Sequence, residues 1–322
     1  MSAPGPGARA ERWRAIFVVG AGRSGTSALT RGLAALGVAL GDRLKAPSTK
    51  NPTGFFEDAE LLEQAKRARD ALGLRAESVA LVDPAAFDSP ALEALAHETA
   101  ERVRRRFGAF PVWGFKYAQT LRFLPFWERV AQLAALDVSY LVALRSPISV
   151  ARSRAALDPV RGVQEKSDAE WLVNVVPFFR RLAQRPFVVT DFDALVAKPE
   201  AELSRVAERL ALPLGPDVRA AVEAYARGFL DAGRRHTSFA DADLDADPRL
   251  CPLARDAYRW LRRLARDELA PDAPELWREW ARLEAALAAQ APLLRHVDRL
   301  EAALRRRSNP LGELLRRLGL RR

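Results

Sequence analysis

The sequence lacks cysteine pairs and long apolar runs. Cys251 is its only cysteine, so no intrachain disulfide can form, which is typical of proteins in a reducing compartment. No segment approaches the apolar length that spans a bilayer, and the run Ile16–Val19 is too short for the core of a signal peptide. These absences predict a cytoplasmic protein without a membrane-spanning helix.

The charge is concentrated at the C-terminal end. The net charge is +10, and residues 305–322 supply six of these ten charges, because they carry seven arginines and one acid, Glu313. The remaining sequence is only mildly basic and has no basic stripe interleaved with aromatic residues, so we expect no nucleic-acid partner. With 49% hydrophobic and 29% charged residues, the composition is that of a globular protein long enough to bury a full core.

Residues 18–31, VVGAGRSGTSALTR, resemble a phosphate-binding Walker A loop, G-x-x-x-x-G-K-[ST]. Gly20 and Gly25 have the separation of the two motif glycines, and Ser27 occupies the final position. Thr26 replaces the lysine that contacts a nucleotide triphosphate, and an arginine, Arg23, stands inside the loop. The apolar run before the loop and the helical leucine spacing after it predict the strand–loop–helix context that such a loop requires.

Further apolar segments alternate with helical ones and predict an α/β fold. They are uniformly apolar rather than alternating, which indicates a parallel sheet covered on both faces. The expected strands are residues 15–20, 111–116, 139–145 and 186–192. The expected helices are residues 57–74, 90–107, 121–136, one from Pro147, 199–211, 216–230, 252–267 and 273–307.

Cations follow three of the expected strands. In a parallel sheet, ligands bind beyond the carboxyl ends of the strands, where Arg23, Lys116 and Arg145 should meet near a helix N-terminus. This pattern predicts a site for a strongly anionic ligand. Asp191, at the end of the last strand, could hold magnesium in a phosphoryl transferase, but D-F-D-A-L also has the pattern of a capped helix start, which we favour.

Four motifs in combination resemble the bacterial members of the sulfotransferase superfamily. They are R-S-G-T-S after the first strand, N-P-T-G-F-F-E-D, G-F-K followed by L-P-F-W, and L-R-S-P-I-S-V-A-R-S, and the resemblance covers residues 16 to 266. It implies a three-layer sandwich with a central parallel sheet, like that of P-loop nucleoside-triphosphate hydrolases. It also implies a metal-free transfer of a sulfuryl group from 3′-phosphoadenosine 5′-phosphosulfate (PAPS) to a hydroxyl or amine.

The resemblance assigns roles to individual residues. Arg23 would neutralise the charge that develops on the leaving phosphate, and Arg145 with Ser153 would bind the 3′-phosphate. Lys116 matches a lysine of the family's K-D-P-R segment and is a catalytic candidate, whereas Gln119 replaces the arginine and has no assigned role. The residues matching the 5′-phosphosulfate loop are Gly22, Arg23, Ser24, Gly25, Thr26 and Ser27. The basic turn Arg234, Arg235 and His236 could close over the nucleotide or be a solvated turn.

The acceptor also needs a base. His97 and His296 lie in helical segments away from every motif, so we expect a carboxylate. Glu57, after the N-P-T-G-F-F turn, is our choice, with Asp58 and Asp42 as alternatives. Glu57 could instead cap the helix that follows it, where acids are favoured.

The remaining expectations concern organisation and partners. We expect a flexible segment at residues 1–14, a sulfotransferase domain at 15–270, and a helical extension at 271–307 that could form a coiled coil and a homodimer. Residues 308–322 form a basic amphipathic tail that could contact the inner face of a membrane or be solvated.

Residues 38–54, 75–90 and 155–167 are candidate acceptor loops, and the arginine in DPVRGVQEK favours a polar or anionic acceptor such as a glycan. Docking of the tail on a membrane would favour a glycolipid. Two alternatives remain at this point: a kinase-like enzyme that uses ATP and magnesium, and a non-catalytic nucleotide-binding scaffold.

Overall fold

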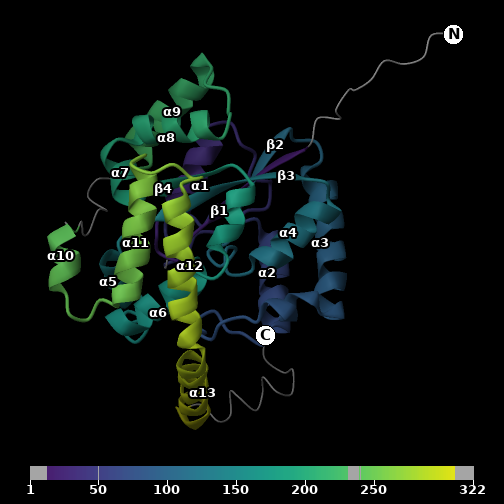
Figure 1. Cartoon of the computed structure of the whole chain (residues 1–322). Helices are drawn as coiled ribbons and strands as arrows, with labels where there is room; N and C mark the ends of the chain where they lie inside the picture. Colours follow the sequence, from purple (N-terminus) through teal and green to yellow (C-terminus); the bar gives the residue numbers. More distant parts are fainter. Residues whose placement is uncertain (1–12, 50, 231–238, 240, 309–322) are drawn as a thin grey trace.

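Four parallel strands form the centre of the protein. The structure is a computed structural model that describes residues 13–49, 51–230, 239 and 241–308 (Figure 1). The strand order is β2 (Val112–Lys116), β1 (Arg14–Val19), β3 (Asp137–Leu144) and β4 (Phe187–Asp191), and every neighbouring pair is parallel. All four predicted strands are confirmed, and their carboxyl ends meet at one edge of the sheet.

Helices cover both faces of the sheet. The thirteen labelled α-helices are α1 (Thr26–Ala35), α2 (Ala59–Ala71), α3 (Pro90–Phe107), α4 (Leu124–Leu133), α5 (Pro147–Ala155), α6 (Gln164–Val175), α7 (Phe192–Ala197), α8 (Pro199–Arg209), α9 (Pro216–Gly228), α10 (Asp241–Ala246), α11 (Pro252–Ala265), α12 (Pro274–Ala289) and α13 (Ala291–Ser308). Two short 3₁₀ helices, η1 (Pro84–Asp88) and η2 (Phe179–Gln184), lie between them. The predicted α/β class with helices on both faces of a parallel sheet is confirmed.

Alternate residues of β1 enter two different hydrophobic cores. Phe17 and Val19 pack with residues of α2, α3, α4, α11 and α12, while Ile16 and Val18 pack with residues of α1, α8 and α9. Phe17 lies 5.9 to 6.2 Å, between ring centroids, from four aromatic side chains, and replacing it with alanine should cost about 3–5 kcal/mol. The glycine loop therefore follows a central strand that is buried on both faces.

The C-terminal extension is two helices, which corrects the single helix expected over residues 273–307. Helix α12 ends at Ala289 and α13 begins at Ala291, with Gln290 between them. Pro292 explains the break, because a proline ring clashes with the carbonyl four residues earlier and so prevents a continuous helix. Helix α12 packs Leu276, Trp280 and Leu287 into the core that also covers the sheet.

Other differences are small or lie outside the described residues. Helix α6 begins inside the expected loop 155–167 and was not predicted. Residues 1–12, the turn Arg234–His236 and the tail from residue 309 fall outside the described residues. No helix within the described ranges combines the length and apolarity needed to cross a membrane.

Candidate functional site

The loop between β1 and α1 is shaped by backbone conformations that few residues adopt. Gly25, the N-cap of α1, has φ 86°, and Arg23 has φ 74°. A Cβ on Gly20 would lie 2.5 Å from the carbonyl oxygen of Ala143 in β3, so the chain turns there at backbone contact. No side chain caps α1, and its first N–H groups are available to an anion.

A cavity of about 480 Å³ opens beside this loop. It brings together six of the predicted ligand-binding residues: Arg23, Gly25, Thr26, Ser27, Arg145 and Ser153. Asn51, Phe192 and Phe229 also line it and were not predicted as site residues. Its wall contains two arginines and no carboxylate within the described part of the chain, so its charge favours an anion.

Arg145 follows β3 and is almost completely buried. Its guanidinium lies 4.7 Å from the ring centre of Phe192 and donates to the carbonyl of Arg23 at 3.3 Å. Its Nε is buried without a hydrogen-bond partner among the described residues. Burial lowers the pKa of Arg145, with Asp193 acting against the shift, yet an arginine stays charged in proteins. A buried cation with an unused donor is costly unless an anion binds it.

Arg23 links the two expected phosphate positions. Its Nε donates to Ser153 Oγ on α5 at 3.0 Å, so the loop and the residue predicted for the 3′-phosphate are in direct contact. Ser24 and Gly22 do not line the cavity: Ser24 is buried beneath the loop, and the carbonyl of Gly22 accepts from Arg154 at 3.5 Å. These two residues therefore belong to the loop but face the protein interior and not the cavity.

Arg154, which was not predicted, supports the loop from the protein interior. It is buried, donates to the carbonyl of Ser167 at 2.9 Å and pairs with Glu170 at 3.4 Å. Glu170 also pairs with Arg161 at 2.6 Å, in the segment between α5 and α6. The only signal in the sequence was an arginine directly after Ser153, which does not distinguish a buried side chain from an exposed one.

Glu57 and Lys116 form a second group at the end of β2. Lys116 Nζ donates to Glu57 Oε1 at 2.9 Å, and both side chains are buried. Lys45, a more exposed residue, approaches Glu57 Oε2 at 3.5 Å. Burial lowers the pKa of Lys116, and the charge of Glu57 opposes that shift. The predicted candidates Glu57 and Lys116 are therefore one ion pair.

This ion pair is connected to the cavity through one short segment. Ser27 Oγ donates to the carbonyl of Phe55 at 3.4 Å and accepts from Asn51 Nδ2 at 3.2 Å. Glu57 follows Phe55 by two residues, so the start of α1 and the carboxylate are held by the same turn. Asn51 belongs to the N-P-T-G motif, which the sequence singled out without indicating this contact.

The capping role belongs to Asp58 and not to Glu57. Asp58 accepts from the backbone N–H groups of Glu60 at 3.1 Å and Leu61 at 3.0 Å, at the start of α2. Asp58 and Asp42 also both pair with Arg106, at 2.6 and 2.8 Å. The alternative that Glu57 caps the helix is wrong. Asp58 instead forms the cap and pairs with Arg106, and Asp42 also pairs with Arg106.

Asp191 caps α7, as predicted. Its Oδ1 accepts from the N–H groups of Asp193 at 2.8 Å and Ala194 at 3.3 Å, and its Oδ2 accepts from Tyr258 at 3.4 Å. The cluster of at least three Cys, His, Asp or Glu side chains that a metal ion usually needs does not occur among the described residues. His97 is exposed on α3, where it contacts Glu93 at 3.1 Å, and His296 is exposed on α13.

Side chains from several elements hold the backbone of residues 76–80. Gln119 Nε2 donates to the carbonyl of Ala76 at 3.1 Å, while its Oε1 accepts from Tyr117 at 2.7 Å. Arg122 donates to the carbonyls of residues 78 and 80, and Lys166 to that of residue 77. Asp298 of α13 accepts from the N–H groups of residues 79 and 80. This predicted acceptor loop is fixed next to the end of β2.

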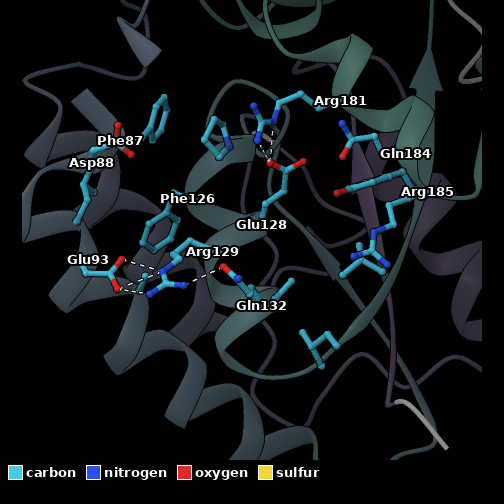
Figure 2. Close-up of a pocket in the computed structure, with 17 residues that line it drawn as sticks. Phe87, Asp88, Glu93, Phe126, Glu128, Arg129, Gln132, Arg181, Gln184 and Arg185 are labelled. Carbon is cyan, nitrogen blue, oxygen red and sulfur yellow. Dashed lines mark hydrogen bonds and ion pairs between the residues drawn. The ribbon is translucent and has the colours of Figure 1, made fainter. Parts of the chain in front are cut away.

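A larger cavity, of about 700 Å³, lies beside the first half of β3. Figure 2 shows its charged side chains paired with one another: Arg129 with Glu93, and Arg181 with Glu128. Arg185 at its edge pairs with Asp137 at 3.5 Å. Because its arginines are neutralised by carboxylates, this cavity has none of the anion-binding character of the site at the carboxyl edge.

Comparisons with known proteins add likenesses of overall shape. No protein-family model matches the sequence, and no curated protein is significantly similar to it. Sulfotransferase STF1 from Mycobacterium tuberculosis is similar in structure at a TM-score of 0.40 and 15% identity, over 78% of this chain and 76% of that one. The sulfotransferase domain of the Synechococcus olefin synthase gives 0.41 and 13%, over 85% and 94%. Sulfotransferase STF9 from Mycobacterium avium gives 0.42 and 15%, over 68% and 69%. At these values the likenesses carry no functional inference, which rests on the site.

Proposed function

We propose that the protein is a sulfotransferase that moves a sulfuryl group from PAPS to a hydroxyl or amine of an acceptor. The observation that carries this proposal is the cavity in which a phosphate loop without its lysine meets Arg23, Arg145 and Ser153. Arg23 in the loop and Arg145 at the end of β3 give the cavity two cationic groups, which suits a nucleotide with phosphate at both its 5′ and 3′ positions. A nucleotide triphosphate would present its charge at one end only.

The sheet order supports one orientation of this nucleotide. The glycine loop follows β1, Arg145 follows β3 on one side, and Lys116 ends β2 on the other. With the phosphosulfate on the loop, the 3′-phosphate would lie toward Arg145 and the sulfuryl group toward Glu57 and Lys116. Phe192 supplies apolar surface for the nucleoside on the Arg145 side, and Phe229, which packs against Phe56, adds apolar surface elsewhere on the cavity wall.

The pairing of Glu57 indicates which of its oxygens accepts the proton. Oε1 is held by the buried Lys116 at 2.9 Å, whereas Oε2 has the longer contact, 3.5 Å, with the more exposed Lys45. An acceptor hydroxyl can therefore replace Lys45 at Oε2 without breaking the buried pair. Lys116 keeps the carboxylate in place and adds positive charge where the negative sulfuryl group reacts.

The reaction balances with these groups alone. The acceptor O–H gives its proton to Glu57, its oxygen forms a bond to sulfur, and the bond from sulfur to the 5′-phosphate oxygen breaks. Adenosine 3′,5′-bisphosphate leaves with the charge that Arg23 and the N–H groups of α1 stabilise. The loop N–H groups stabilise this developing charge without having to reorient, so they lower the barrier of this step.

Thermal unfolding with nucleotides tests the proposal. Adenosine 3′,5′-bisphosphate at 100 times its Kd should add about 2.7 kcal/mol to the free energy of unfolding. ATP with magnesium should stabilise the protein much less. Stabilisation by ATP with magnesium and none by the bisphosphate would refute the sulfotransferase and favour a kinase. Stabilisation by the bisphosphate without transfer to any acceptor would favour a nucleotide-binding scaffold.

We propose a glycan or glycolipid as the acceptor class. Lys45, beside Glu57, lies in a predicted acceptor loop and is an exposed cation. Arg161, in the predicted loop after α5, pairs with Glu170 and is partly exposed, so it offers an acceptor a polar side chain. Radiolabelled PAPS offered with glycan, lipid and small phenolic acceptors tests the class. Transfer only to the phenols would overturn it while leaving the sulfotransferase itself intact.

A further inference from the structure

Helix α13 has one face directed at the protein and another directed at solvent. On the inner face, Leu294 is buried in the core, Asp298 accepts from the backbone of residues 79 and 80, and Glu301 pairs with Lys166 at 2.6 Å. These contacts fix the rotation of the helix about its axis. In Figure 1, α13 continues from α12 toward the end of the molecule opposite α8 and α9.

The outer face of α13 carries large apolar side chains at helical spacing. Leu293 is 62% exposed, Leu300 is 51% exposed and Leu304 is 63% exposed. Steps of seven and four residues bring them to one side of the helix. A single exposed leucine needs no explanation. Three leucines on one side of a helix indicate a surface that binds a protein or a membrane.

The exposed charged side chains of α13 have one sign. Arg295, Arg299, Arg306 and Arg307 are exposed on the same helix. The two acids within α13 are Asp298 and Glu301, and both are held on the inner face. The solvent-facing surface of α13 therefore combines leucines with arginines and presents no carboxylate.

We propose that this face of α13 docks on an anionic lipid bilayer. Leucines on one face of a helix and basic side chains on its other exposed face are the pattern of helices that lie in the membrane interface. The row from Leu293 to Leu304 covers about 16 Å at 1.5 Å per residue, so the helix lies along the surface and does not cross it.

Vesicle co-sedimentation of the full chain tests the proposal. Phosphatidylcholine vesicles with about one third phosphatidylglycerol should bind the protein, and neutral phosphatidylcholine vesicles should bind it at least tenfold more weakly. Replacing Leu300→Ser and Leu304→Ser together should reduce binding to the anionic vesicles at least tenfold. Added salt should weaken binding of the wild type.

Two matched double variants control for position. Leu157→Ser with Val160→Ser removes exposed apolar side chains after α5, which are 41% and 75% exposed, and should leave vesicle binding unchanged. Leu314→Ser with Leu318→Ser makes the same chemical change in the segment after α13, and it should reduce vesicle binding less than the variant at positions 300 and 304 does. Circular dichroism and thermal unfolding verify that each variant is folded.

Three outcomes would overturn the proposal. The first is equal binding to neutral and anionic vesicles. The second is loss of binding in the variant at positions 314 and 318 with full binding in the variant at positions 300 and 304. The third is a wild-type dimer in light scattering that the variant at positions 300 and 304 converts to a monomer, which would make this face a contact between two copies. None of these outcomes depends on the sulfotransferase activity.

Discussion

Replacing Arg145 with alanine should remove the affinity for one phosphate of adenosine 3′,5′-bisphosphate and leave the rest of the binding energy unchanged. Arg145 is buried, faces the cavity and has an Nε without a partner among the described residues. A hydrogen bond to a charged group contributes about 1.5–3 kcal/mol, so the Kd should rise about 10- to 150-fold.

The second ligand in this experiment is adenosine 5′-monophosphate, which lacks the 3′-phosphate. Calorimetric titration of both ligands into both proteins gives a four-membered cycle. The wild type should prefer the bisphosphate, and Arg145→Ala should lose most of this preference while binding the monophosphate nearly as before. The cycle therefore isolates the contribution of the 3′-phosphate from any general damage to the cavity.

Arg152→Ala is the matched control. Arg152 is exposed on α5, with its guanidinium 4.5 Å from the ring centre of Phe239, and it does not line the cavity. Its loss should leave both affinities within about twofold, the effect expected of an exposed side chain that does not line the cavity. If Arg145→Ala weakens both ligands equally, or neither, then Arg145 does not bind the 3′-phosphate and the orientation of the nucleotide is wrong.

Three further predictions address the base, the loop and the charges. Glu57→Gln should lower kcat about 10²- to 10⁴-fold with an unchanged Kd for the bisphosphate, and full activity of this variant in the PAPS assay would remove Glu57 as base. Gly25→Ala should weaken bisphosphate binding at least tenfold by titration, because its φ is 86° and the new Cβ would lie 2.3 Å from Phe192 Cδ2; a wild-type Kd would contradict the loop geometry. Hydrogen bonds from Arg67 and Arg102 lower the pKa of Glu98 from 4.5 to about 2, so the ionised group stabilises the fold above pH 4.5 and loses this effect as the pH falls toward 2. Since Glu98 is partly exposed, Glu98→Gln should cost about 1 kcal/mol at pH 7 and less at pH 3 in urea unfolding; an equal cost at both pH values would show that the ion pairs do not contribute.

The strand ends could be predicted because they depend on local patterns. Apolar runs that end in a glycine loop, a lysine or an arginine predict both the strands and the edge at which these residues meet. The structure brings Arg23 and Arg145 to one cavity as those patterns indicate, whereas Lys116 does not line it and pairs with Glu57. Ser153, which only the resemblance assigned, also lines the cavity. The cap at Asp191 is also local, since its partners lie two and three residues away.

Contacts between distant segments could not be predicted in this way. Glu57 and Asp58 are neighbours with the same chemistry. Asp58 is a local helix cap, whereas the buried ion pair of Glu57 depends on Lys116, 59 residues away. Arg154 is one of many arginines in the sequence, and its buried position depends on Glu170 in another helix. The break before α13 was readable from Pro292 and was missed because the leucine spacing continues across it.

The way residues 76–80 are held has a consequence for how this protein could diversify. Their main chain is bound by side chains of Gln119, Arg122, Lys166 and Asp298, all of which lie elsewhere in the sequence. Every residue except proline offers the same backbone N–H and carbonyl groups. Ala76 and Ala80 can therefore change while the path of the segment stays constant, whereas Val79 is buried in the core and Glu77 pairs with Arg305. If this predicted acceptor loop contacts the acceptor, relatives that kept those four partners could acquire different acceptors through substitutions at these two positions.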